Sequence, residues 1–170
     1  MMAGSGKKID AMEKALRILN FRACSELELR RKLRTAGYSS TETADAIERC
    51  RKLGVLNDRL LAEDYARSLS DRGCGARMVR FRLGRRGLGT RSIEAALEAT
   101  AEGEAEACRR ALAAKLRTLE RESDPRRKRE KAFRFLAGRG FSADRIREAF
   151  AEADFSGGTT EKCDDENFTD

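Results

Sequence analysis

The chain contains no histidine, no tryptophan and a single proline among its 170 residues. Without histidine it lacks the commonest general base of enzymes, so neither a Ser-His-Asp nor a Cys-His catalytic arrangement can be assembled. Aromatic residues make up only 6% of the chain and charged residues 38%, a balance rich in helix formers and poor in the residues that strands favour. We therefore expect an all-α protein that is not an enzyme.

Long apolar runs and a secretory leader are also missing. No stretch reaches the roughly 18 apolar residues that a membrane-spanning helix needs, and the opening sequence MMAGSGKK lacks the apolar core of a signal peptide. We expect a cytoplasmic protein with no membrane partner.

The five cysteines are too widely spaced to indicate a metal site. No two of them form a C-x-x-C motif, and no histidine is available to complete a zinc set. We interpret them as small, partly buried, reduced thiols, and we predict no metal and no cofactor. They are Cys24, Cys50, Cys74, Cys108 and Cys163.

Positive charge is concentrated in the body of the chain. The formal net charge is +7, but residues 154 to 170 hold six acidic residues and one lysine, so the 153 residues before them carry +12. A tail of this composition is expected to be disordered. A strongly basic body favours attraction to nucleic acid or to an acidic protein surface.

One pattern occurs three times, with copies 50 and then 53 residues apart. In each copy a leucine precedes a glycine by four residues, an apolar residue follows the glycine directly, and another follows it by ten. Glycine ends a helix by adopting a left-handed conformation, and the next apolar residue folds back on the last turn. Each copy therefore predicts a helix, a glycine turn and a second helix. The copies are Leu33, Gly37, Tyr38 and Ile47; Leu83, Gly87, Leu88 and Leu97; and Leu136, Gly140, Phe141 and Phe150.

A third amphipathic stretch precedes each helix pair, so the sequence predicts an all-α tandem array of three three-helix repeats with no sheet. Such repeats touch mainly their neighbours, so we expect an elongated, curved molecule with three small cores. The repeats are placed at residues 10–57, 58–101 and 102–153, and the acidic tail at 154–170. The nine expected helices are 10–23, 25–36, 40–53, 58–71, 75–86, 90–99, 104–120, 125–138 and 142–152.

Several helix starts carry local signals. Residues 25–28 and 39–42 both fit the S-x-x-E capping box, in which a serine and a glutamate cap each other's backbone. Asn57 or Asp58 is a suitable cap for the next helix, and Asp124 followed by Pro125 is suitable for another.

The second repeat holds an unusual run of arginines. Between residues 72 and 91 there are seven arginines and no acidic residue, whereas elsewhere the two signs alternate. Guanidinium groups that repel one another are better explained by an anionic partner than by stability. Phe81 lies on the outward half of the same helix, where it would either pack against the adjoining repeat or serve as an apolar anchor. The candidate partner-binding residues are Arg72, Arg77, Arg80, Arg82, Arg85 and Arg86.

A second basic run opens the middle helix of the third repeat. It consists of Arg126, Arg127, Lys128 and Arg129. Acidic residues lie close by, so a mixed-charge solvated surface explains this run as well as a binding site does. A helix-turn-helix reading is disfavoured because the third helices lack the Asn and Gln residues that read base edges. Any contact with DNA should therefore be to phosphates and independent of sequence.

Three segments together resemble the central signature of the RecX family: LNDRLLAEDY from residue 56, GARMV from residue 75 and LGRRGL from residue 83. The segment SELELRRKL in the first repeat is similar to the same family, and the likeness runs over about residues 12–152. The residues that carry the central motif are Asn57, Asp58, Ala62, Tyr65, Gly75, Leu83 and Gly87. The chain departs from the family pattern at Leu61, Arg82 and Arg86, where an aromatic, an acidic residue and a lysine are common.

The resemblance implies a bacterial cytoplasmic regulator of the RecA recombinase, acting in homologous recombination, DNA repair and the SOS response. Members of the family bind RecA filaments on DNA, lodge in the filament groove and restrain ATPase, strand-exchange and co-protease activities. Our leading hypothesis is that Arg77, Arg80, Arg85 and Arg86 form the centre of a non-catalytic inhibitory surface on a monomer. The alternative is an autonomous, sequence-independent DNA-binding protein that acts through phosphate contacts.

Overall fold

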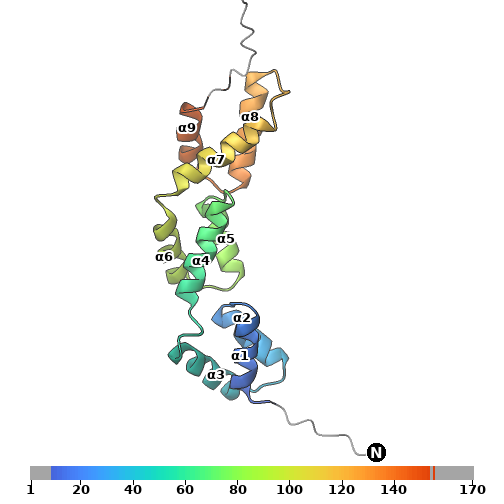
Figure 1. Cartoon of the computed structure of the whole chain (residues 1–170), viewed down its shortest axis with the longest axis vertical. Coiled ribbons are helices and arrows are strands. Elements are labelled where there is room, and N and C mark those ends of the chain that lie inside the picture. Colours follow the sequence, from blue (N-terminus) through green and yellow to red (C-terminus); the bar gives the residue numbers. More distant parts are fainter. Residues whose placement is uncertain (1–8, 154, 156–170) are drawn as a thin grey trace, which may run out of the picture.

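The computed structural model describes residues 9–153 and 155, and these residues form nine α-helices and no strand. The helices follow one another in three groups of three, stacked along the long axis of the molecule (Figure 1). We call α1 to α3 the first unit, α4 to α6 the second and α7 to α9 the third. The helices are α1 (Ala11–Phe21), α2 (Glu26–Thr35), α3 (Ser40–Lys52), α4 (Asp58–Asp71), α5 (Ala76–Arg85), α6 (Thr90–Thr100), α7 (Glu104–Arg117), α8 (Pro125–Gly138) and α9 (Ala143–Ala151).

The predicted all-α tandem array is confirmed, and most helix limits agree to within two residues. The largest difference is at α7, which ends at Arg117 instead of residue 120. Its last turn tightens, because the amides of Thr118 and Leu119 donate to carbonyls only three residues back. The expected acidic tail lies outside the described residues, apart from Phe155.

Helix starts and stops follow the signals in the sequence. Both capping boxes form, with the Ser25 and Ser39 hydroxyls accepting the amides of Glu28 and Glu42. Asn57 and Asp124 cap α4 and α8. The glycine turn recurs in each unit, with positive φ angles of 86°, 75° and 90° at Gly37, Gly87 and Gly140.

Each unit has its own hydrophobic core. Leu29, Leu33 and Ile47 lie at the centre of the first, Leu69, Val79 and Leu83 of the second, and Leu136, Phe141 and Ile146 of the third. The cysteines within the described residues are free and buried, and burial raises the pKa of the Cys108 thiol to about 11. No helix in this part of the chain is long and apolar enough to cross a lipid bilayer.

The second and third units meet through their main chains. The amide of Gly75, just before α5, donates to the carbonyl of Arg139 at 2.9 Å, and the Arg77 amide donates to the Gly140 carbonyl at 3.2 Å. The Arg139 guanidinium reaches back to the carbonyls of Arg72 and Gly73. The approach is so close that a Cβ atom added to Gly75 would lie 2.5 Å from the Phe141 nitrogen. This contact fixes where α5 lies against the third unit.

Candidate partner-binding surface

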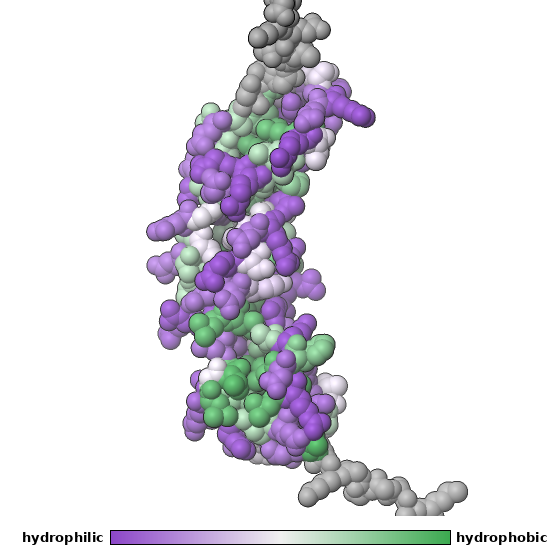
Figure 2. All heavy atoms as spheres, viewed as in Figure 1, coloured by the Kyte–Doolittle hydropathy of each residue, from purple (hydrophilic) through white to green (hydrophobic). Residues whose placement is uncertain are grey.

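Helix α5 presents a stripe of basic and aromatic side chains. Val79 and Leu83 are buried against the core of the second unit. Arg77, Phe81 and Arg85 follow one another at intervals of four residues, so they project from the opposite face of the helix. We call Arg77, Phe81 and Arg85, with the adjacent Arg82, the α5 stripe. Hydrophilic residues predominate over the second unit in Figure 2, whereas hydrophobic ones gather mainly over the first.

Phe81 is the most exposed large apolar side chain of the second unit, with 60% of its surface accessible. The Arg85 guanidinium carbon lies 5.9 Å from the centre of its ring, within the range of a cation–π contact. Together with Arg77 and Met78 the ring lines a groove of about 250 Å³ whose other wall is Ala137, Gly138 and Gly140 of the third unit. The ring therefore borders the adjoining unit without being buried by it.

Three arginines of the stripe have no acidic partner. Within the described residues, Arg77, Arg82 and Arg85 form no ion pair with a carboxylate, although most other arginines of the chain do. Arg72 is likewise exposed, and its carbonyl accepts from Arg139. Their guanidinium groups are thus available to an external anion.

Arg80 differs from the expectation that this arginine run is uncompensated. Its guanidinium donates to both carboxylate oxygens of Glu94 in α6, at 2.9 and 2.8 Å. Both side chains are about half exposed, so the pair contributes at most about 1 kcal/mol to stability. Glu94 lies 14 positions away in the sequence, and only the packing of α6 against α5 brings the two together.

Replacing Glu94 with Gln is expected to free Arg80 and to tighten binding of a polyanion at low salt by up to about fivefold. The measurement is fluorescence anisotropy with labelled single-stranded DNA. Glu98→Gln is the matched control, because it removes the same charge from the same helix at a side chain that has no ion pair in the described chain. Equal tightening in both variants would show a general charge effect and would contradict a specific role of the Arg80 pair.

Arg86 also departs from the expectation of a free guanidinium. It lies just after α5 at the contact with the first unit, and its side chain is only 19% exposed. Its Nη2 atom donates at 3.0 Å to Glu28 and at 3.0 Å to the carbonyl of Ala23. The guanidinium carbon also lies 5.0 Å from the ring centre of Tyr65. Arg86 therefore holds two units together and does not belong to the exposed stripe.

Electrostatics support this assignment of Arg86. Burial alone would raise the pKa of the Glu28 carboxyl, but the hydrogen bonds from Arg86 and from the Ser25 amide outweigh it and hold the pKa below its ordinary value. The same hydrogen bond raises the pKa of Arg86. Both groups are charged at neutral pH and stabilise each other.

The second basic run of the sequence does not form a continuous basic surface. Lys128 is buried, with 6% of its surface exposed. Arg127 pairs with Asp124 at 3.5 Å, and the Arg129 guanidinium lies over the rings of Phe150 and Phe155. Arg126 and Arg129 are both exposed and without an ion pair, but of these two only Arg126 also lacks a ring contact among the described side chains. Because consecutive residues of a helix point in different directions, the four side chains lie on different sides of α8.

The residues of the family motif lie at helix caps, in the core and at junctions between units. Asn57 caps α4, and Asp58 accepts the amide of Glu26 from the first unit at 2.9 Å. Ala62 and Leu83 are fully buried. Gly75 and Gly87 lie where neighbouring units touch, and a Cβ atom on Gly87 would collide with the Leu27 side chain. These motif residues thus specify how the units join. Of the exposed stripe, Arg77 and Arg85 lie within the GARMV and LGRRGL segments, and Phe81 and Arg82 lie between those segments.

Three residues at these junctions were missed in the sequence. They are Ser25, whose hydroxyl donates to the Arg86 carbonyl at 2.5 Å, together with Glu28 and Arg139. A signal existed for Arg139, because Arg86 and Arg139 each directly precede the glycine of their repeat. No comparable signal identifies Glu28 among the other glutamates.

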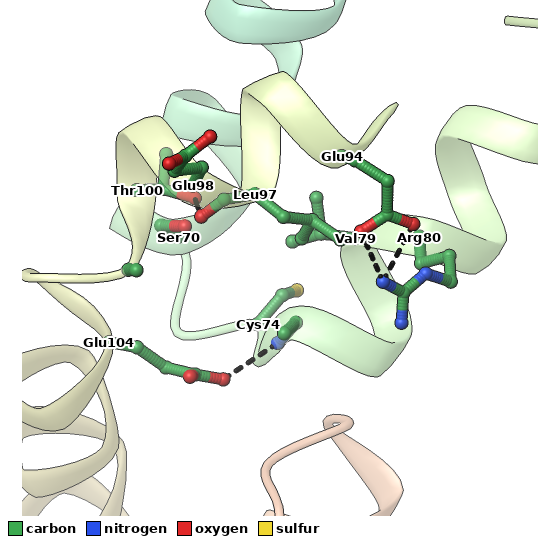
Figure 3. Close-up of a pocket in the computed structure, with 11 residues that line it drawn as sticks. Ser70, Cys74, Val79, Arg80, Glu94, Leu97, Glu98, Thr100 and Glu104 are labelled. Carbon is green, nitrogen blue, oxygen red and sulfur yellow. Dashed lines mark hydrogen bonds and ion pairs between the residues drawn. The ribbon is translucent and has the colours of Figure 1, made fainter. Parts of the chain in front are cut away.

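The second unit also contains a pocket of about 440 Å³ between α4, α5, α6 and the start of α7 (Figure 3). Cys74, Val79 and Leu97 line it, and the carboxylates of Glu94 and Glu104 lie at its edge. Both carboxylates are engaged, Glu94 with Arg80 and Glu104 with the amide of Ala76 at 2.8 Å. These two carboxylates therefore already have hydrogen-bond partners within the fold.

Comparisons with known proteins agree with this architecture. Residues 11–50 match a family model described as the first three-helix domain of RecX, and residues 102–150 match its third three-helix domain. Regulatory protein RecX of Chlorobaculum tepidum is 38% identical over 144 residues, which cover 84% of this chain and 88% of the relative. Regulatory protein RecX of Chromohalobacter salexigens is 34% identical, covering 82% of this chain and 90% of the relative.

The crystal structure of RecX from Lactobacillus salivarius is similar in fold. It superposes with a TM-score of 0.77 at 23% sequence identity, over 84% of this chain and 93% of that one. The three-helix units, the matches to two domain models and the identity to full-length relatives point to one conclusion: the chain belongs to the RecX family.

Proposed function

We propose that the chain is a non-enzymatic cytoplasmic regulator that binds RecA filaments on DNA as a monomer and inhibits RecA activities by lodging in the filament groove. The observation that carries the proposal is the α5 stripe, with three unpaired arginines around an exposed phenyl ring at the middle of an elongated array. Its relatives bear the name regulatory protein RecX. RecA as the target follows from the family resemblance.

The chemistry of the stripe suits a partner that offers both anions and apolar surface. Guanidinium groups bind carboxylates and phosphates with two parallel hydrogen bonds, and those of Arg77, Arg82 and Arg85 do not have to leave an internal carboxylate first. Phe81 adds an apolar anchor, which is a common centre of protein interfaces. A nucleoprotein filament presents both kinds of group, whereas the backbone of naked DNA presents mainly phosphates.

Co-sedimentation tests the proposal directly. The full chain should pellet with RecA filaments on single-stranded DNA at concentrations at which it does not pellet with the same DNA alone, and it should inhibit the RecA ATPase over the same range. Equal binding to naked and RecA-coated DNA, or filament binding without any change in RecA activity, would overturn the proposal.

The same unpaired arginines support a second candidate, an autonomous DNA-binding protein that acts through phosphate contacts. If about five phosphates were neutralised, the logarithm of the affinity for naked DNA should fall with the logarithm of salt concentration at a slope of about −4 to −5. Tight binding with this slope, and no preference for RecA-coated DNA, would favour the second candidate over the first.

A further inference from the structure

The two junctions between units are built on the same plan. In each, an arginine that precedes the glycine turn reaches back to main-chain carbonyls of the unit before it: Arg86 to Ala23, and Arg139 to Arg72 and Gly73. In each, an acid from the start of the next unit accepts the first amide of the middle helix. Asp58 accepts from Glu26, and Glu104 accepts from Ala76. These shared bonds make the two junctions directly comparable.

They differ in what else holds them. The second junction adds two main-chain hydrogen bonds, from Gly75 and Arg77 to the glycine turn of the third unit, and a backbone approach that leaves no room for a Cβ atom. Among the described residues, no main-chain hydrogen bond joins the first and second units. There the corresponding positions carry side chains: the Ser25 hydroxyl replaces the Gly75 amide as donor, and Glu28 pairs with Arg86.

From this difference we propose that the first junction is a hinge latched by the ion pair of Arg86 and Glu28, and that the second and third units move as one rigid body. Glu28 is a shared acceptor, since Arg22 also lies 3.6 Å from it. Such a pair has two charged partners at the rim of the junction, 19% and 20% exposed, so salt and competing anions can reach it. The main-chain hydrogen bonds of the second junction join uncharged groups of closely packed backbones, so salt and competing anions do not weaken them in this way.

Arg86 directly follows Arg85 of the α5 stripe in the chain, although side chains of consecutive helical residues do not face each other. An anionic partner that binds the stripe and also reaches Arg86 would compete with Glu28 for its guanidinium. Exchange of Glu28 for that anion would release the first unit to swing. The hinge is a property of the free chain and does not depend on RecA being the partner.

The relative order of the units can be measured by residual dipolar couplings of backbone amides in the full chain. The wild type at low salt should give one alignment tensor for all three units. Glu28→Gln should reduce the magnitude of the alignment tensor of the first unit to at most about half its wild-type value, because the first unit then samples many orientations. The second and third units should keep a common tensor. Glutamine preserves the capping box of α2, so helix loss is not expected.

Matched variants separate a hinge from general loosening. Glu42→Gln makes the same change in the capping box of α3 and should leave one common tensor. Arg86→Met should act like Glu28→Gln, whereas Arg139→Met at the equivalent position should leave the second and third units aligned, because their main-chain bonds remain. Raising salt from about 0.05 to about 0.5 M should loosen only the first unit of the wild type.

Two results would overturn the hinge. One is a single tensor that persists in both Glu28→Gln and Arg86→Met, and the other is a loosening of the second junction by Arg139→Met as large as that of the first by Arg86→Met. Neither measurement involves RecA or DNA, so a negative result here leaves the proposed function to its own test.

Discussion

Replacing Arg77, Arg82 and Arg85 together with alanine is expected to weaken inhibition of the RecA ATPase at least ~30-fold, which corresponds to about 2 kcal/mol of binding free energy. These side chains have no carboxylate partner in the described chain, so their removal leaves no internal charge unpaired. The helical circular dichroism signal and the unfolding temperature should therefore stay close to those of the wild type. The measurement is the concentration of the variant that gives half-maximal inhibition.

A triple variant of Arg17, Arg67 and Arg109 provides the control. These arginines are exposed, lie on helices and pair with a carboxylate one turn away, so the variant removes the same total charge without touching the stripe. It should retain inhibition to within about threefold, since such exposed pairs contribute little. A comparable loss in both triple variants would show that only net charge matters, and the placement of the binding surface on α5 would be wrong.

The Gly75→Ala variant is expected to lower the free energy of unfolding by about 2 to 4 kcal/mol, a large effect for a single methyl group. The added Cβ would lie 2.5 Å from the Phe141 nitrogen and 2.6 Å from the Gly140 carbonyl, both of which are main-chain atoms that cannot rotate away. Relief requires the third unit to retreat, which breaks the main-chain bonds made by Gly75 and Arg77. Urea unfolding measures the loss.

Gly89→Ala is its matched control. Both glycines are N-caps with similar extended backbone angles, at φ −82° for Gly75 and −70° for Gly89, but a Cβ atom on Gly89 meets nothing within 4 Å. The control should cost only about 0.5 to 1 kcal/mol, the usual difference between glycine and alanine at an N-cap. Equal losses in the two variants would mean that the second junction contributes nothing specific to stability.

Much of the fold could be predicted because its determinants are local. The serine and glutamate of each capping box are three residues apart, and the glycine of each turn lies four residues after a core leucine. Such short-range patterns recur in each unit, so the repeat reinforces every individual signal. The exposed position of Phe81 follows from the same periodicity, since Val79 and Leu83 define the buried side of α5.

The partners of the arginines could not be predicted in this way. The contacts between Arg80 and Glu94 and between Arg86 and Glu28 join residues 14 and 58 positions apart. They depend on the angle between two helices in one case and between two units in the other. A local count of charges made the arginine run appear uncompensated, although packing supplies acids to two of its members. The burial of Lys128, by contrast, follows from helix periodicity and could have been predicted from the sequence.

The recurring junction has a consequence for how long such a protein can be. Of the three units described, only the second has the junction residues for both neighbours. Arg86 and Gly87 contact the unit before it, and the Ala76 amide donates to an acid of the unit after it. The first unit has Ala36 before its glycine, and the middle helix of the third begins with Pro125, which has no amide hydrogen to donate. A second copy of this unit, inserted between the second and third units, should therefore form the same junction contacts on both sides. Duplication of the second unit is the simplest way to extend the array from three units to four.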